Sequence, residues 1–220
     1  MSRPIIVVGF GGHGRVVTAA LQAAGRKIIG ATDLRPENHA ANSFGVRILS
    51  DEALLDEFAP RDVLLVSGLG SILPVNELCP RHRLVRRFQE HGYEFTGFQH
   101  PASWVAPGAT IATTAQIHAG AIVQPGTVVG DFTILNTRSS VDHDCVVEEY
   151  CHIAPGVTVS GNVVICRGTH LGTGANLIQG LRLGAGCFVA AGATVVGDVE
   201  SGAFVRGVPA RTFVPKPQVV

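Results

Sequence analysis

The chain of 220 residues and 23.0 kDa carries 17 basic and 17 acidic residues, which gives a formal net charge of zero. A balanced charge lacks the electropositive footprint of a nucleic-acid-binding protein. Charged residues at 15% and a mean hydropathy of +0.30 exclude a disordered chain. No apolar run approaches the roughly 20 residues that cross a bilayer, so we expect neither a nucleic-acid nor a membrane partner. Five cysteines without a Cys-x-x-Cys pair, and an N-terminus without a secretory signal pattern, predict a cytoplasmic location.

Strand and helix signals alternate along residues 1–97, which we predict to form one small domain. Apolar runs predict strands at 5–9, 27–33 and 62–67, and apolar residues at helical spacing predict helices at 15–25, 51–58 and 76–91. We interpret the basic run 81–87 in the last helix as a solvated face. Such alternation is typical of a parallel sheet. Three strands make a Rossmann-like βαβαβ unit, which is half of a doubly wound fold.

A glycine-rich turn, Gly9-Phe-Gly-Gly-His-Gly14, joins the first predicted strand to the first predicted helix. A turn in this place suits a phosphate, because Gly11 and Gly12 permit close backbone approach and the helix N-terminus favours negative charge. Asp33 ends the second predicted strand, where a dinucleotide-binding domain carries its ribose-binding acid. The motif alone therefore leaves NAD open as a ligand, but a half-sized sheet without a hydride-transfer domain argues against it.

A different pattern begins near His100 and continues through residues 98–220, which we predict to be a second domain. Sixteen aliphatic residues recur every six positions: Val105, Ile111, Ile117, Val123, Val129, Leu135, Val141, Val147, Ile153, Val159, Ile165, Leu171, Leu177, Leu183, Val189 and Val195. A small residue mostly stands two positions before each of them, and Cys145, Cys151 and Cys187 occupy that slot. This period predicts a parallel β-helix of hexapeptide repeats, in which three hexads make one coil. The closing RGVPAR and the proline-rich tail predict a cap for the open end.

The segments GGHGRVV, HPASWVAP, NTRSSVDHDC, CHIAPG and RGVPAR follow one another in this order. In this series the chain resembles the bacterial hexapeptide-repeat acyltransferases of the sialic acid O-acetyltransferase-like family. The resemblance is to the group that N-acetylates nucleotide-linked 4-amino-4,6-dideoxy sugars, such as UDP-4-amino sugars and GDP-perosamine. It implies an N-terminal domain that holds the nucleotide sugar, a left-handed β-helix, acetyl-CoA as co-substrate, no metal, and a homotrimer with active sites between subunits.

Acyl transfer to an amine needs a proton acceptor and hydrogen-bond donors for the developing oxyanion. His143 stands between Asp142 and Asp144, and a carboxylate beside an imidazole fixes its tautomer and makes it more basic. The residues alone leave His143 equally open as a polar turn residue. The resemblance implies that His143 is the general base and that Asp144 orients it. Gly161 follows one coil after His143, and the resemblance makes its N–H an oxyanion donor.

The resemblance also assigns the binding residues. It implies that Asn136 lies near the sugar and that His152 contacts acetyl-CoA. The remaining acetyl-CoA contacts are expected at Gly161, Gly172, Ala175, Ala190 and Gly192, and the remaining nucleotide-sugar contacts at Gly11, Gly12, His13, Asp33 and Arg35.

Three other functions compete with this interpretation. A sugar O-acetyltransferase would use the same histidine, and a nucleotide-sugar-binding scaffold would keep the prism without the chemistry. A β-helix carbonic anhydrase would hold zinc with three histidines, and His118, His143, His152 and His170 are available. Their spacing lacks the close pair of that family, which argues against zinc.

Overall fold

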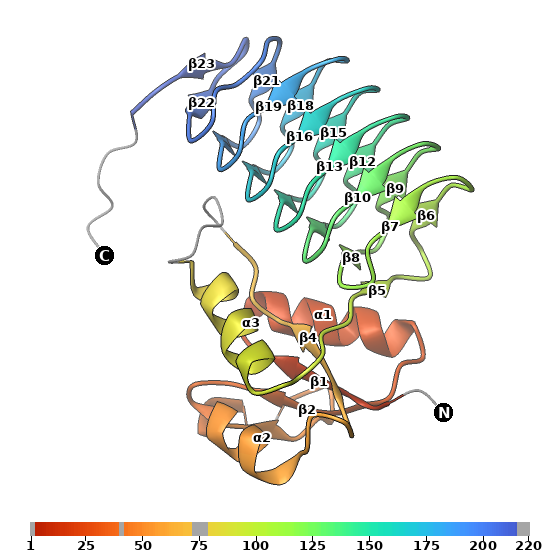
Figure 1. The fold of residues 1–220 in the computed structure, drawn as a ribbon, viewed down its shortest axis with the longest axis vertical. Coiled ribbons are helices and arrows are strands. Elements are labelled where there is room, and N and C mark those ends of the chain that lie inside the picture. Colours follow the sequence, from red (N-terminus) through yellow and green to blue (C-terminus); the bar gives the residue numbers. More distant parts are fainter. Residues whose placement is uncertain (1–2, 40–41, 72–78, 215–220) are drawn as a thin grey trace. The chain divides into compact units, whose positions relative to one another are not determined.

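The computed structural model describes residues 3–39, 42–71 and 79–214 (Figure 1). These residues divide by their contacts into two compact units. The first holds 3–70 and 79–101, and the second holds Ser71 and 102–214. No helix in the described ranges has the length and apolar character needed to cross a membrane.

The first unit is a parallel α/β domain. Its elements are β1 (Ile5–Val8), α1 (Gly12–Ala23), β2 (Ile28–Thr32), the short 3-10 helix η1 (Pro36–His39), β3 (Ile48–Leu49), α2 (Asp51–Glu57), β4 (Leu64–Ser67), α3 (Pro80–Glu90) and β5 (Phe98–Gln99). The sheet order is β3-β2-β1-β4, with every pair parallel. The βαβαβ prediction is confirmed, and the structure adds β3, whose two residues are too few to show a pattern in the sequence.

Helices cover both faces of this sheet. Odd-numbered residues of β1 pack with Val17 and Leu21 of α1 on one face. Even-numbered residues of β1 pack with Leu54 of α2 and Phe88 of α3 on the other. This three-layer arrangement explains why β1 is apolar at every position, because both faces of the strand are buried.

Two predicted helix boundaries and one predicted surface were wrong. The first helix begins at Gly12 rather than residue 15, so the glycine-rich turn is shorter than expected. Gly14 lies inside that helix, where a side chain would come within 1.9 Å of the Gly9 carbonyl oxygen. The last helix begins at Pro80, and residues 76–78 of the prediction lie outside the described residues. Arg81 is 1% exposed, so the basic run is not wholly a solvated face.

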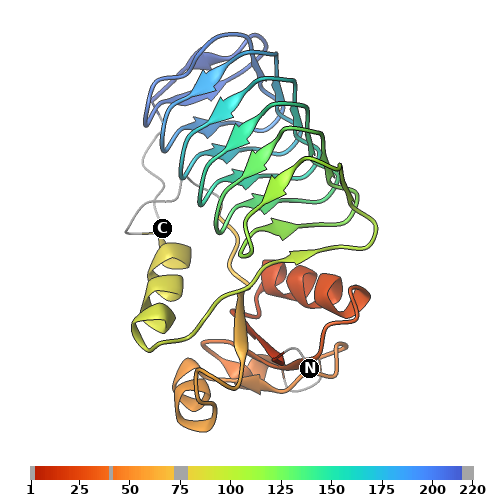
Figure 2. The same ribbon diagram turned by 45° about the vertical axis from the view of Figure 1, so that its right-hand side comes forward.

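The second unit is a prism of stacked coils (Figure 2). Each predicted aliphatic residue is the second residue of a two-residue strand: β6 (Trp104–Val105), β7 (Thr110–Ile111), β8 (Gln116–Ile117), β9 (Ile122–Val123), β10 (Val128–Val129), β11 (Ile134–Leu135), β12 (Ser140–Val141), β13 (Val146–Val147), β14 (His152–Ile153), β15 (Thr158–Val159), β16 (Val164–Ile165), β17 (His170–Leu171), β18 (Asn176–Leu177), β19 (Arg182–Leu183), β20 (Phe188–Val189) and β21 (Thr194–Val195). Strands three apart in order pair in parallel with a register of 18 residues, as Val128↔Val146 and Val146↔Val164 show. The unit is the left-handed parallel β-helix that the resemblance implies.

The turns between strands explain the repeat in physical terms. One position in nearly every turn has a positive φ and is mostly glycine, for example Gly126 at +75° and Gly180 at +73°. Asp144 occupies this position at +57°, a conformation that aspartate tolerates better than most side chains. The predicted small slot is confirmed, since Cys145 and Cys151 are fully buried in the core.

The chain turns back at the end of the prism, where the sequence analysis expects a cap. β22 (Phe204–Arg206) continues the sheet of β20, and β23 (Arg211–Thr212) turns back to pair antiparallel with β22. A strand that turns back covers part of the open edge. The proline-rich end of the tail, 215–220, lies outside the described residues.

Candidate active site

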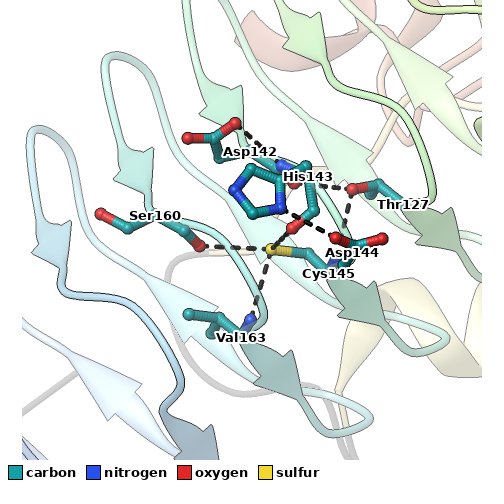
Figure 3. A network of polar contacts seen from close by, with 7 residues as sticks. All are labelled: Thr127, Asp142, His143, Asp144, Cys145, Ser160 and Val163. Carbon is teal, nitrogen blue, oxygen red and sulfur yellow. Dashed lines mark hydrogen bonds and ion pairs between the residues drawn. The ribbon is translucent and has the colours of Figure 1, made fainter.

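His143 stands on the exposed turn between β12 and β13 (Figure 3). Its Nδ1–H donates to Asp144 Oδ2 over 2.8 Å, and its backbone N–H donates to Asp142 Oδ1 over 2.8 Å. Asp144 therefore reaches the imidazole directly, because the positive φ of this residue turns its short side chain back along the chain. The contact leaves Nε2 as the unprotonated nitrogen of the neutral ring.

The two carboxylates make the imidazole more basic. The hydrogen bond that His143 donates to Asp144 is the largest influence and raises the pKa of His143 above its ordinary value. Desolvation, the second-largest influence, lowers this pKa, and the negative charges of Asp142 and Asp144, each a smaller influence, raise it. A base with this environment suits proton abstraction near neutral pH.

Gly161 lies directly against the reactive nitrogen. A methyl group on Gly161 would come within 2.6 Å of His143 Nε2 and 2.7 Å of Cε1. The stacking that the 18-residue arithmetic predicts is therefore present. Across the described ranges, the Gly161 N–H has no hydrogen-bond acceptor in the protein, so a donor without a partner lies beside the base.

A hydrogen-bond network inside the prism supports this turn (Figure 3). Thr127 Oγ1 donates to the Asp142 carbonyl over 2.7 Å. Cys145 Sγ lies 3.3 Å from the Ser160 carbonyl oxygen and 3.4 Å from the Val163 nitrogen. Burial raises the pKa of the Cys145 thiol. The cysteine thus joins consecutive coils under the histidine as a neutral structural group.

Asn136 and His152 form a second polar group on the turn between β11 and β12 and on β14. The Thr137 N–H donates to Asn136 Oδ1 over 2.8 Å, and Asn136 Nδ2 lies 3.2 Å from His152 Nε2. His152 Nδ1 lies 2.5 Å from the carbonyl oxygen of Ser71. Both ring nitrogens of this 7% exposed histidine therefore have partners within the protein, and its contact with acetyl-CoA stays a prediction.

His170 continues this column one coil further on. Its ring lies edge-on to that of His152, with 5.0 Å between centroids, and stacks on Phe188 at 5.3 Å. Burial lowers the pKa of His170 to about 4. It is therefore neutral at physiological pH and places no charge beside His152.

The two polar groups lie on different corners of the prism. Asn136 follows β11, a strand of the sheet that contains β14, whereas His143 follows β12, a strand of the next sheet. Within one chain the structure does not bring the expected sugar contact and the expected base together.

The α/β unit holds a separate cavity of about 430 Å³ at the carboxyl ends of its strands. β1 has β2 on one side and β4 on the other, so this edge is the switch point where ligands bind in open parallel sheets. The cavity is lined by Gly9, Phe10, Gly11, Thr32, Asp33, Leu34, Asp51, Leu69, Pro80, Arg83, Leu84 and Arg87.

Of the expected nucleotide contacts, Gly11 and Asp33 line this cavity, whereas Gly12, His13 and Arg35 do not. Gly12 has open space where a side chain would be. Asp33 is already engaged, because its Oδ1 accepts the Arg35 N–H over 3.0 Å and its Oδ2 lies 3.3 Å from His39 Nε2.

Helix α3 contributes two arginines that the sequence analysis did not assign to a site. Arg87 pairs with Asp51 at 3.3 Å and with Glu52 at 3.1 Å. The guanidinium of Arg83 makes no ion pair or hydrogen bond with any other described residue. The basic run was the available signal, but nothing in the sequence says which side of the helix meets the glycine-rich turn.

The expected acetyl-CoA residues differ in accessibility. Ala190 is half-buried and Gly192 is exposed. Ala175 is fully buried in the prism core, and Gly172 is buried with no room for a side chain, since one would come within 2.5 Å of the Ala191 nitrogen. Ala175 therefore offers no side chain to a ligand, because its methyl group fills the small slot, and its assignment to the acetyl-CoA groove stays a prediction. No group of three histidine, cysteine, aspartate or glutamate side chains converges on a metal position in residues 3–39, 42–71 and 79–214.

Comparison with known proteins identifies the family. Residues 4–73 match the family described as the PglD N-terminal domain. The acetyltransferase domain of PglB from Neisseria gonorrhoeae, solved with acetyl coenzyme A, is 31% identical, with a TM-score of 0.86 over 97% of this chain and 100% of that chain. The chain belongs to the PglD-like N-acetyltransferase family.

Two further solved structures are similar to the chain. PerB from Caulobacter crescentus, in complex with CoA and GDP-perosamine, is 30% identical, with a TM-score of 0.86 over 97% of this chain and 99% of that chain. WeeI from Acinetobacter baumannii, 24% identical over 96% of this chain and 100% of that chain, shares the fold with a TM-score of 0.84. No curated protein sequence matches the chain. As a member of this family the chain is an acetyltransferase.

Proposed function

We propose that the protein transfers the acetyl group of acetyl-CoA to the 4-amino group of a nucleotide-linked 4-amino-4,6-dideoxy sugar. The observation that carries this proposal is the pair formed by His143 and Asp144, with Nε2 of the histidine unprotonated beside the N–H of Gly161. PglB-like and PerB-like relatives, which are solved with acetyl-CoA or with CoA and GDP-perosamine, supply the substrate class.

The reaction is a direct attack. The sugar amine adds to the thioester carbonyl carbon while His143 Nε2 takes the proton from the nitrogen. The carbonyl oxygen becomes an oxyanion and accepts a hydrogen bond from the Gly161 N–H. The tetrahedral intermediate then breaks its carbon–sulfur bond, and the imidazolium returns the proton to the thiolate of CoA. Asp144 stays ionised and stabilises the imidazolium throughout.

The acceptor is held by its nucleotide in the cavity of the α/β unit. The N-terminus of α1 at Gly12 and the guanidinium of Arg83 favour its diphosphate. Asp33, at the carboxyl end of β2, suits a ribose hydroxyl. Gly12, His13 and Arg35 remain proposed contacts at the edge of this site.

Acetyl-CoA needs an open surface along the prism. The exposed corner that carries Ala190 and Gly192 offers one. A second cavity, of about 400 Å³, lies on the corner that follows Asn136 and is lined by Thr137, Arg138, Pro155 and Gly156. We assign the acetyl-CoA groove to the corner of the prism that carries this second cavity.

The complete site requires more than one copy of the chain. Asn136 and His143 occupy different corners of the prism. A neighbouring copy of the chain must therefore bring its Asn136 corner beside the His143 corner of the first copy. Exposed apolar residues support association, because Trp104, Ile122, Val128 and Val146 are 57%, 39%, 42% and 36% exposed on two sheets of the prism. A cyclic homotrimer satisfies this geometry and closes on itself.

The test is an acetylation assay with His143→Ala. A lost general base lowers kcat by roughly 10²–10⁴, and the fold should persist because His143 is exposed. An unchanged kcat would contradict the proposal. A sugar hydroxyl as acceptor would appear as acetylation that survives removal of the amino group from the substrate, and a scaffold would bind nucleotide sugar without any transfer.

A further inference from the structure

Two oppositely charged side chains line the cavity of the α/β unit beside each other. Arg87 Nη1 of α3 donates to Asp51 Oδ2 of α2 over 3.3 Å, and both residues belong to the cavity lining. The Asp51 side chain is only 12% exposed, so its carboxylate has lost most of its contact with water. Glu52 also accepts from Arg87, over 3.1 Å, but it is not part of the lining, and its side chain is 72% exposed.

The charge of this group makes it a poor site for a diphosphate. The single positive charge of Arg87 faces two carboxylates, those of Asp51 and Glu52, so the group as a whole repels an anion. Arg83 lines the same cavity one helical turn earlier on α3, and its guanidinium makes no ion pair within residues 3–39, 42–71 and 79–214. The diphosphate therefore suits Arg83 and the N-terminus of α1, and a neutral part of the nucleotide must face Asp51 and Arg87.

The atoms that the ion pair leaves available form an edge with a definite order. Arg87 Nη1 carries a second hydrogen that the contact with Asp51 does not use. Asp51 Oδ2 keeps a lone pair, and Asp51 Oδ1 accepts no hydrogen bond from any residue in the described part of the chain. From Arg87 to Asp51 the edge therefore presents a donor, an acceptor and a second acceptor.

One nucleobase edge is complementary to this order. Guanine presents the acceptor O6 followed by the donors N1–H and N2–H, so all three positions can pair. Uracil and thymine present an acceptor, a donor and an acceptor, which sets a carbonyl oxygen against Asp51 Oδ1 and leaves two desolvated oxygens without a donor. Cytosine has the same order as the protein edge, and adenine places an amino group against the donor of Arg87.

We infer that Asp51 and Arg87 recognise the Watson–Crick edge of guanine, so that the acceptor sugar is carried by GDP. The inference rests on the proposed function for the presence of a nucleotide sugar in this cavity. Leu34, Pro80 and Leu84 line the same cavity and supply apolar side chains for the faces of the purine ring. The base, the ribose and the diphosphate then each have their own group of residues in one cavity.

The test measures the binding of nucleoside diphosphates and needs no turnover. Calorimetry with the full-length protein compares the Kd values of GDP, inosine diphosphate, UDP and dTDP. Inosine lacks only the N2 amino group of guanine, so it keeps the contacts of O6 and N1–H and loses the contact with Asp51 Oδ1. We expect inosine diphosphate to bind about 10-fold more weakly than GDP, because a hydrogen bond to a charged group is lost, and UDP and dTDP to bind more weakly still. Equal Kd values for GDP and inosine diphosphate, or tighter binding of UDP or dTDP than of GDP, would overturn the inference.

Asp51→Asn has a matched control in Glu52→Gln. Each substitution removes one negative charge and one partner of Arg87, but only Asp51 lines the cavity. We expect the ratio of the inosine diphosphate Kd to the GDP Kd to fall from about 10 to about 1 in Asp51→Asn and to stay at about 10 in Glu52→Gln. The ratio compares two ligands on the same variant, so a lower stability of the variant does not imitate this result. Equal changes of the ratio in both variants would mean that net charge sets the preference, and would overturn the inference.

The proposed function and this inference can fail separately. A preference for GDP without acetylation of any GDP-linked amino sugar would contradict the proposed function and leave the inference standing. Acetylation of a UDP- or dTDP-linked sugar in preference to its GDP-linked counterpart would support the proposed function and overturn the inference. If none of the four diphosphates binds, the inference is overturned together with the proposed nucleotide cavity.

Discussion

Adding one methyl group at Gly161 is the sharpest perturbation of the candidate active site. The methyl carbon of Gly161→Ala would lie 2.6 Å from His143 Nε2, whereas ordinary contact begins at 3.4 Å, so the ring must retreat by about 0.8 Å. Gly161 does not have a positive φ, so alanine fits its backbone. The ring is exposed and can swing away, which spares the fold. A displacement of about 1 Å in a reacting group costs on the order of 10²-fold in rate.

We therefore expect Gly161→Ala to lower kcat about 10²-fold, measured by release of the CoA thiol at saturating substrates, with Tm within about 2 °C of wild type. Gly197→Ala is a matched control, because Gly197 occupies the same position of the repeat two coils later and has nothing within 4 Å of the new methyl. Wild-type kcat in Gly161→Ala would refute the reasoning that Nε2 must stay where the structure places it. A loss of the same size in Gly197→Ala would refute it too.

Three further predictions concern charge. Asp144→Asn removes the contact that raises the pKa of His143, so the acid limb of kcat/KM should move to lower pH; a limb that does not move would mean another group titrates. Arg83→Ala should raise KM for the nucleotide sugar about 10-fold or more with little change in kcat, while Arg86→Ala, whose guanidinium pairs with Glu90 on the same helix, should leave KM unchanged; equal effects would remove Arg83 from the nucleotide site. Burial holds the pKa of His170 at about 4, against 6.5 for an exposed histidine, so the unfolded chain binds more protons than the folded chain between these two pH values. The free energy of unfolding should therefore fall by up to about 3 kcal/mol as the pH drops from 6.5 to 4. Urea titrations of His170→Phe should show a smaller fall with pH, and an equal fall in both proteins would mean that another group takes up the proton.

The prism follows from the sequence because its repeat leaves little choice. Every sixth residue must be aliphatic to fill the axis, and the position before the next strand must be small. The positions of Val141 and Cys145 in the core can therefore be predicted from the repeat alone. The contact of Gly161 with His143 follows from the same arithmetic, as 18 residues make one coil. The six residues between Asn136 and His143 also indicate that these two residues occupy neighbouring corners.

Contacts between segments far apart in the chain could not be predicted. Ser71 meets His152 across 81 positions, and no local pattern in the sequence marks a serine backbone carbonyl for such a contact. The burial of Arg81 and the exposure of Arg83 depend on how α3 lies on its sheet. The basic run places charged residues all around the helix, so the sequence does not show which of them is buried. β3 is two residues long, so packing beside β2 creates it rather than any periodicity.

The central claim is that this chain moves an acetyl group from acetyl-CoA to the amine of a nucleotide-linked amino sugar through His143. Mass spectrometry of purified protein incubated with acetyl-CoA and UDP-, GDP- and dTDP-linked 4-amino-4,6-dideoxy sugars tests it most directly. We expect the gain of one acetyl group on the 4-amino nitrogen of one member of this panel, and a gain reduced roughly 10²–10⁴-fold in rate with His143→Ala. Failure to acetylate any member, or equal acetylation by His143→Ala, would contradict it.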